Sequence, residues 1–169
     1  MTTARPLPTA APLPLPRDYG VAKRPMDWGE VSAKLAEARV YWLATVRADG
    51  RPHVVPSDGI WLDDALYFGG GPESVHMRNV RANPKVAAHV GDGLEVTIVV
   101  EGTALDETPG RDVAARVADA NNTKYADFGM NLTPDDYIRR GVTILCPERV
   151  LAWSRFPTDA TRFTFALDG

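Results

Sequence analysis

The sequence predicts a mainly β protein with flanking helices, its strands closed into a barrel. Runs of β-branched and aromatic residues are separated by tight-turn residues, and Asp49-Gly50 is a strong hairpin signal. Several runs, such as 41–44 and 98–100, are apolar on both faces, so both faces must be covered. A closed barrel whose outside is buried by a second copy satisfies this pattern. A β-sandwich is the competing architecture, but it does not supply the glycine-rich strand-to-helix junction described below.

The elements follow in order along the chain. Asp27 is a candidate cap for a short amphipathic helix, and strand patterns before and after Asp49-Gly50 predict the first hairpin. A second tight turn is expected at 63–64 and another hairpin around 91–93. Beyond these, the pattern predicts a helix from Pro109, a short one from Thr133-Pro134, and strands to the end.

The N-terminal segment differs in composition from the rest. Proline is so dense in residues 1–26 that neither a helix nor a signal-peptide apolar region can form. We expect a flexible, extended tail there and a single domain at 27–169. The alternative is an arm that packs on a partner subunit.

Composition excludes several classes of function. The net charge of −3 gives no basic field for nucleic acid, and no apolar run is long enough to span a membrane. A single cysteine, Cys146, excludes an internal disulfide and fits a reducing compartment, so we expect a cytoplasmic protein. The histidines at 53, 76 and 89 match no common ligand spacing, so we expect no metal.

The most informative segment runs from Ala65 to Pro84. A short apolar run meets three glycines, and Pro72 and Glu73 then suit the first turn of a helix that ends at Asn83. Unpaired N–H groups at a helix N-terminus, in a loop without side chains, suit a phosphate or another anion. Arginines one or two turns later add positive charge. The alternative is a glycine turn before a surface helix whose arginines face water.

Three segments in this order resemble a known family. They are LATVRADGRPHVVP at 43–56, DDALYFGGGPESVHMRNVRANPKVAAHV at 63–90 and VVEGTA at 99–104. The pattern is similar to the pyridoxamine 5'-phosphate oxidase-like split β-barrels that bind flavins or deazaflavins, and most similar to the actinobacterial branch that uses the deazaflavin F420. The resemblance implies a six-stranded antiparallel split barrel, homodimeric, with two cofactor sites in grooves between the subunits.

The resemblance also implies which residues hold the cofactor. The second strand would lie along the ring system, the glycine junction would hold the phosphate end, and residues near the C-terminus would come from the other subunit. In that order, these are His53, Val54, Val55, Pro56 and Ser57; Gly69, Gly70, Glu73, Ser74, His76, Arg78 and Asn79; and Trp153 and Arg155.

One position departs from the family. Relatives commonly carry lysine or arginine where His76 stands, and histidine is largely neutral at pH 7. Loss of one charged hydrogen bond costs roughly 1.5–3 kcal/mol, unless Arg78, Arg81 or Lys85 compensates.

The functional expectation is an oxidoreductase that uses F420, or alternatively FMN, to transfer a hydride to or from a small conjugated molecule. The chain shows neither a serine–histidine–acid pattern nor a paired-carboxylate spacing, which fits chemistry that belongs to a cofactor, and no catalytic residue is assigned. Two alternatives stay open: a non-catalytic barrel that binds flavin, haem or a related tetrapyrrole, and a structural dimer that has lost its ligand.

Overall fold

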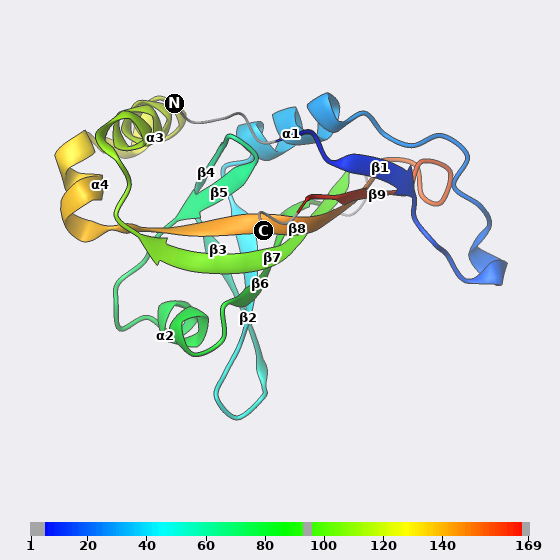
Figure 1. Cartoon of the computed structure of the whole chain (residues 1–169), viewed down its shortest axis with the longest axis horizontal. Coiled ribbons are helices and arrows are strands. Elements are labelled where there is room, and N and C mark those ends of the chain that lie inside the picture. Colours follow the sequence, from blue (N-terminus) through cyan, green and yellow to red (C-terminus); the bar gives the residue numbers. More distant parts are fainter. Residues whose placement is uncertain (1–5, 93–95, 167–169) are drawn as a thin grey trace.

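The protein, described by a computed structural model over residues 6–92 and 96–166, is built on one antiparallel sheet (Figure 1). The strand order is β1-β9-β8-β7-β6-β2-β3, and the hairpin β4–β5 joins the sheet through β8. The strands are β1 Thr9–Pro12, β2 Tyr41–Val46, β3 Pro52–Ser57, β4 Ile60–Leu62, β5 Ala65–Phe68, β6 Lys85–Gly91, β7 Thr97–Glu107, β8 Val142–Trp153 and β9 Thr161–Thr164. The helices are α1 Trp28–Glu37, α2 Val75–Ala82, α3 Arg111–Lys124 and α4 Pro134–Arg140, with short 3-10 turns at Arg17–Tyr19 and Ala126–Phe128.

The mainly β fold with flanking helices is as predicted, but the number of strands is not. The sheet has nine strands instead of six, and its end strands β1 and β3 are not paired to each other. Within the described residues the sheet therefore curls without closing. None of the helices in these two described stretches is long and apolar enough to cross a membrane.

The longest strand, β8, has two partners along one edge. Its first half pairs with β5 and its second half with β9, while β7 pairs with its other edge throughout. The division falls at a bulge, where Glu101 pairs with Arg149 but Gly102 pairs with Pro147. A Cβ on Gly102 would lie 2.1 Å from the carbonyl oxygen of Cys146, so only glycine permits this close approach.

Local signals placed most elements correctly. The Asp27 carboxylate accepts from the Glu30 N–H at the start of α1, and Asp63 and Asp64 both have positive φ in the β4–β5 turn. Thr133 forms a capping box at α4. Helix α3 begins two residues after Pro109, and the predicted turn at 91–93 extends into residues outside the described ranges.

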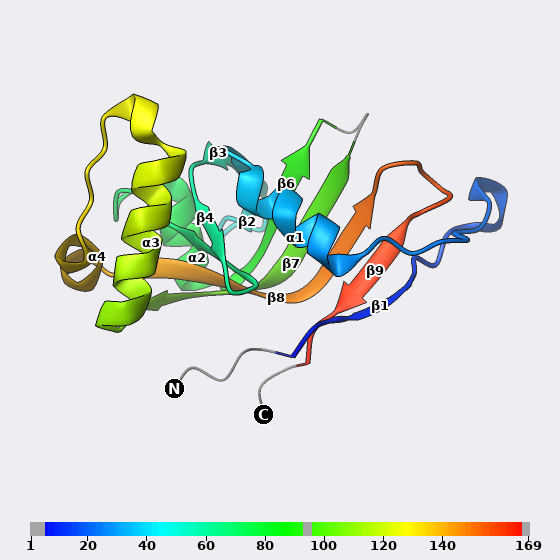
Figure 2. The ribbon, with the colours of Figure 1, turned by 90° about the horizontal axis from the view of Figure 1, so that it is seen from above.

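The N-terminal segment differs from the flexible tail predicted for residues 1–26. Residues 9–12 form β1, which pairs antiparallel with β9 along Thr9–Thr164 to Pro12–Thr161 (Figure 2). Further on, Leu13 N–H donates to Ala160 O, and Lys23 N–H donates to Thr158 O. The chain is extended, as proline favours, but it is held by backbone hydrogen bonds to β9 and to the β8–β9 loop.

The main core lies inside the curled sheet. Helices α1 and α2 lie on opposite sides of the strands in Figure 1, and both contribute to it. Trp28 and Leu35 of α1 and Met77 and Val80 of α2 are buried in the same cluster as the inward side chains of the strands. Burial of these apolar faces fixes where both helices sit.

A smaller core joins α3 to the β4–β5 hairpin, and a polar cluster around Lys124 and Tyr125 adjoins it. Lys124 Nζ donates to Ala38 O at 2.9 Å, to Gly59 O at 3.2 Å and to Tyr41 Oη at 3.3 Å. The Tyr125 hydroxyl is hydrogen-bonded to Gly59 and Arg39 backbone groups. Burial lowers the pKa of Lys124 to about 8.

The outward face of β2 and β3 carries exposed apolar side chains. Trp42 is 46% exposed and Val54 is 58% exposed, while Val40 and Val46 are also exposed. This is the second face that the sequence pattern required to be covered, and within one protomer it is open.

Gly102→Ala tests the close approach at the bulge. The added methyl group would collide with the Cys146 carbonyl, so we expect unfolding free energy to fall by roughly 1–3 kcal/mol in urea denaturation. Gly110→Ala is the matched control, because nothing lies within 4 Å of its Cβ position. Equal stability of the two variants would contradict the steric account.

Lys124→Met tests the buried ammonium through pH. Because the pKa of Lys124 is lowered on folding, the unfolded chain binds more protons above pH 8, and wild-type stability gains with rising pH from this group. Between pH 7.5 and 9.5 we expect the unfolding free energy of the wild type to rise by about 1 kcal/mol more than that of the variant. The difference is kept this small because partial exposure and three oxygen acceptors offset part of the burial penalty. Parallel pH profiles from urea denaturation would show that Lys124 does not titrate in this way.

Candidate cofactor site

The glycine junction connects β5 to α2 as the sequence suggested, with one shift. Pro72 and Glu73 lie in a turn before the helix, and α2 begins at Val75 with Ser74 at the N-cap. The Ser74 N–H donates to Gly71 O at 2.8 Å, which closes this turn. Nothing lies within 4 Å of the Cβ positions of Gly69 and Gly71, so open space adjoins the loop backbone.

The N-terminus of α2 has unused donors. Ser74 makes no side-chain cap hydrogen bond, and its buried hydroxyl has no partner among the described residues. Helix geometry also leaves the N–H groups of Val75, His76 and Met77 without intrahelical acceptors. A buried, unpaired hydroxyl is costly unless a ligand satisfies it, so this junction has the chemistry of an anion cradle.

The arginines of α2 are turned back onto their own loop. Arg78 Nη1 donates to Glu73 O at 2.7 Å, and Arg81 Nη1 donates to Pro72 O at 2.9 Å. Both guanidinium groups are about half-exposed. They brace the loop from the helix, and the phosphate contact expected of Arg78 stays a prediction.

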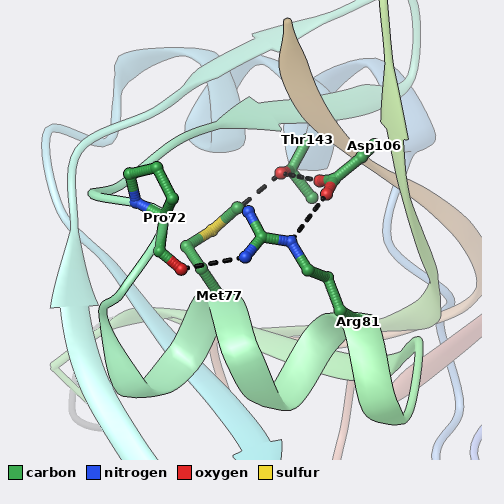
Figure 3. A network of polar contacts seen from close by, with 5 residues as sticks. All are labelled: Pro72, Met77, Arg81, Asp106 and Thr143. Atoms are coloured by element: carbon green, nitrogen blue, oxygen red, sulfur yellow. Dashed lines mark hydrogen bonds and ion pairs between the residues drawn. The ribbon is translucent and has the colours of Figure 1, made fainter. Parts of the chain in front are cut away.

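Figure 3 shows how this brace is anchored to the sheet. Arg81 Nε donates to the Asp106 carboxylate at 3.4 Å, and the buried Thr143 hydroxyl donates to the other oxygen of that carboxylate. Because Asp106 is near the end of β7 and Thr143 is near the start of β8, the glycine loop is tied through Arg81 to these two paired strands. Lys85, the other candidate cation, pairs with Glu148 at 2.6 Å.

Asn79 is a structural residue. It is 6% exposed, and its side-chain amide donates to Thr45 Oγ1 at 2.9 Å, which ties α2 to β2. The Thr45 hydroxyl in turn lies 3.4 Å from the His53 carbonyl oxygen and 3.5 Å from His53 Nδ1. The predicted phosphate contact by Asn79 is therefore not supported by its position.

Two imidazoles lie beside the junction. His76 Nε2 is 3.4 Å from Gly69 O, and a Cβ on Gly70 would come within 2.5 Å of the same nitrogen, so this ring packs against the glycine turn. Partial desolvation, Arg47 and His76 all lower the pKa of His53. His53, on β3, and His76, on α2, thus share one local electrostatic environment.

Sequence reasoning missed Arg47, which follows β2 in the hairpin loop. It is exposed and close enough to His53 to lower the pKa of that imidazole. In the described parts of the chain its guanidinium has no ion pair or side-chain hydrogen bond. The sequence places both Arg47 and Arg51 in this loop and does not distinguish them. The structure does, because Arg51 pairs with Asp49 at 2.6 Å.

Strand β3 is well placed to line a ligand. It pairs only with β2, so its other backbone edge is open in the described sheet. Val54 and Pro56 are exposed, whereas His53, Val55 and Ser57 are half-buried, with Val55 packed against the core. The open edge leaves backbone groups of β3 accessible, and their contact with a ring stays a prediction.

Trp153 and Arg155 lie far from the junction within one protomer. Phe68, which precedes the glycine loop, pairs with Thr143 at the start of β8, whereas Trp153 ends that strand. Ten residues of strand span about 33 Å. Trp153 packs edge-on against Phe156 with ring centroids 5.6 Å apart, and the Arg155 N–H donates to Asp159 at 2.8 Å.

Two hollows adjoin β3 that the sequence did not indicate. A groove of about 640 Å³ runs over β2, β6 and β7. Its lining includes small residues, such as Ala44, Ala87 and Gly102, and two ion pairs, Lys85–Glu148 and Arg149–Glu101. A pocket of about 210 Å³ adjoins Pro56, Ser57 and Asp58 at the end of β3, and the Arg39 guanidinium there lies over the rings of Tyr125 and Phe128.

Solved structures with the same fold come from proteins of differing function. They include a conserved hypothetical protein, Rv2991, from Mycobacterium tuberculosis (21% identity, TM-score 0.63, 79% of this chain and 88% of that one). A haem-binding protein from Mycobacterium smegmatis matches at 22% identity and TM-score 0.64 over 84% of this chain and 59% of that one. An F420 reductase matches at 27% identity and TM-score 0.55 over 70% of this chain and 94% of that one. No curated protein matches the sequence.

The family model for pyridoxamine 5'-phosphate oxidase matches residues 28–154, which include the sheet from β2 to β8, the glycine junction and α2. The match covers most of the chain and agrees with the fold and with the resemblance in the β3 and junction segments. The chain therefore belongs to the pyridoxamine 5'-phosphate oxidase family.

Proposed function

We propose that the protein is an oxidoreductase that binds F420 and exchanges a hydride with a small conjugated molecule. The observation that carries the proposal is the unpaired, buried Ser74 hydroxyl at the uncapped start of α2, beside open glycine backbone and the edge strand β3. Membership of the family and the 27% identity to an F420 reductase support it.

The residues present fit a flat ring with a phosphate-bearing side chain. The open edge of β3 would bind the polar edge of the ring, and Ser74 with the N–H groups of 75–77 would bind the phosphate. Reduced F420, when bound, would supply the hydride. The protein's own part is to orient the ring and to exclude water, with Arg78 and Arg81 holding the phosphate loop in place.

We propose that the acceptor binds beside the same strand. The 210 Å³ pocket at the end of β3 adjoins the proposed ring strand and has an aromatic wall of Tyr125 and Phe128. Its volume is below the usual range for drug-sized ligands, which favours a single-ring or similarly small molecule.

We further propose a homodimer in which a second copy covers the outward face of β2 and β3. The exposed Trp42, Val46 and Val54 support this, since soluble monomers rarely leave such a patch open. Trp153 and Arg155 lie far from the junction of their own protomer, and in the dimer they would approach the site of the other copy.

A haem-binding protein is the second candidate function. The supporting observation is that two imidazoles, His53 and His76, lie near each other beside an open loop, and imidazole is a common axial ligand of haem iron. Haem titration decides between the two: a Soret band that moves in both His53→Ala and His76→Ala would favour this function and count against F420.

Titration of F420 and FMN into the protein, followed by fluorescence and melting temperature, tests the main proposal. A ligand that binds only the native state must raise its stability, so we expect F420 at 100 times its Kd to stabilise the fold by about 2.7 kcal/mol. Tighter binding of FMN would place the protein in the flavin-dependent branch. No stabilisation by either compound would overturn the proposed function.

Two N-cap variants separate cofactor binding from stability. Ser74→Ala should weaken F420 binding about tenfold with little change in melting temperature, because the hydroxyl has no partner in the described structure. Thr133→Ala should lower unfolding free energy by about 1 kcal/mol without changing F420 affinity, because it removes the capping box of α4. Equal affinities of wild type and Ser74→Ala would remove Ser74 from the site.

Trp42→Glu tests the dimer. A carboxylate in the centre of the covered face would be desolvated without a partner, so we expect a monomer by light scattering and loss of F420 binding. Val21→Glu is the control, since Val21 is 71% exposed and lies in the N-terminal segment. A Trp42→Glu protein with unchanged mass and affinity would contradict this interface.

A further inference from the structure

The positively charged side chains around the proposed phosphate end have acidic partners. Arg78, Arg81 and Lys85 looked available in the sequence, but Arg78 and Arg81 donate to loop carbonyls, and Arg81 and Lys85 also pair with Asp106 and Glu148. Glu73, on the loop itself, is a carboxylate with a 90% exposed side chain, 4.0 Å from Arg78. Each of these three cations therefore has a carboxylate partner within 4.0 Å, although the pair of Arg78 with the exposed Glu73 is the weakest of them.

The positive charge that remains is small. The N-terminus of a helix is equivalent to roughly half an elementary charge. Arg47, across the hairpin and near His53, makes no ion pair in the described ranges, but together with Arg51 it lowers the pKa of the Asp49 carboxylate, so its charge is partly compensated. The groups in direct reach of the loop are the His76 imidazole and the Ser74 hydroxyl, and neither has the permanent positive charge of a lysine or arginine side chain.

Two kinds of phosphate differ in the charge that they would bring. A phosphomonoester such as FMN has a second pKa near 6, so it carries between about −1.5 and −2 at pH 7. A phosphodiester such as that of F420 carries a single negative charge at every pH above the acidic range. Both offer oxygen acceptors to the same N–H and O–H donors.

We propose that this anion end is built for one negative charge, and that the chain therefore selects a phosphodiester-linked cofactor over a phosphomonoester. The inference rests on the proposed function and goes beyond it, because it assigns cofactor choice to the charge state of the junction. His76 is the residue that determines the choice. With lysine or arginine at this position the cradle would neutralise a second charge, and here it does not.

The test uses three ligands with one ring: the F420 chromophore without phosphate, its 5′-phosphate, and the methyl ester of that phosphate. Affinities are measured by fluorescence titration at pH 5.5 and 7.5. We expect the monoester and the diester to bind about equally at pH 5.5, where both carry close to one charge. At pH 7.5 we expect the diester to bind at least about tenfold more tightly, since the monoester is then a dianion. Both ligands are measured with the same protein at each pH, so the ratio of their affinities compares the two phosphates directly.

His76→Lys should bring the two affinities at pH 7.5 back within about threefold of each other, mainly by improving the monoester. Ala82→Lys is the charge-matched control, because Ala82 is exposed at the other end of the same helix. It should leave the ratio near that of wild type. Melting temperatures of all three proteins establish that each is folded, and His76→Arg serves as a second variant if the lysine protein is not.

The outcomes separate this inference from the function on which it rests. Wild-type protein that binds the monoester as tightly as the diester at pH 7.5 overturns the inference and leaves the F420 proposal standing. The same holds if His76→Lys and Ala82→Lys change the ratio equally. Failure of all three ligands to bind overturns the proposed function, and the inference with it.

Discussion

The structure depends on the way β8 bends at its bulge. Gly102 lets the β7 backbone approach the Cys146 carbonyl, and Pro147 follows at the point where the register shifts. The two halves of β8 are thereby free to take different partners along one edge. One half receives β5 and so positions the glycine junction, and the other receives β9 and so positions the loop after Trp153. The glycine junction and the loop after Trp153 are thereby held at opposite ends of a single strand, and in the proposed dimer one copy would supply the junction and the other copy the loop.

Local sequence signals predicted the elements well, because the interactions that define them are local. Asp27 caps the helix that it precedes, and the Asp63–Asp64 pair adopts the backbone conformation that a tight hairpin requires. The strand β1 was missed because its stability comes from pairing with β9, some 150 residues away, and the prolines in and around it favoured a flexible tail. Nothing near Thr9 in the sequence reports that partner.

The candidate site was predicted in part, and for a similar reason. The glycine junction and the edge strand β3 follow from turn chemistry and from the resemblance. The roles of the cations cannot be derived in this way. The sequence shows that Arg81 is present, but it does not show that Arg81 pairs with Asp106, 25 residues away. The resemblance suggests a ligand contact for Asn79, because the sequence alone does not show that its amide donates to Thr45. Polar side chains near a site can be counted from sequence, but whether they are free can be read only from the folded structure.

The two prolines of β3 have a consequence for how the molecule behaves in solution. An edge strand normally offers a ladder of N–H and C=O groups onto which another chain can add, and that risk grows with exposed apolar residues such as Val54. Pro52 and Pro56 lack the N–H group, and proline in a sheet is tolerated where the missing donor faces away from the neighbouring strand. The open edge of β3 is therefore poor in donors and unsuited to continuous pairing. The same strand can stay accessible to a small ligand while resisting edge-to-edge aggregation.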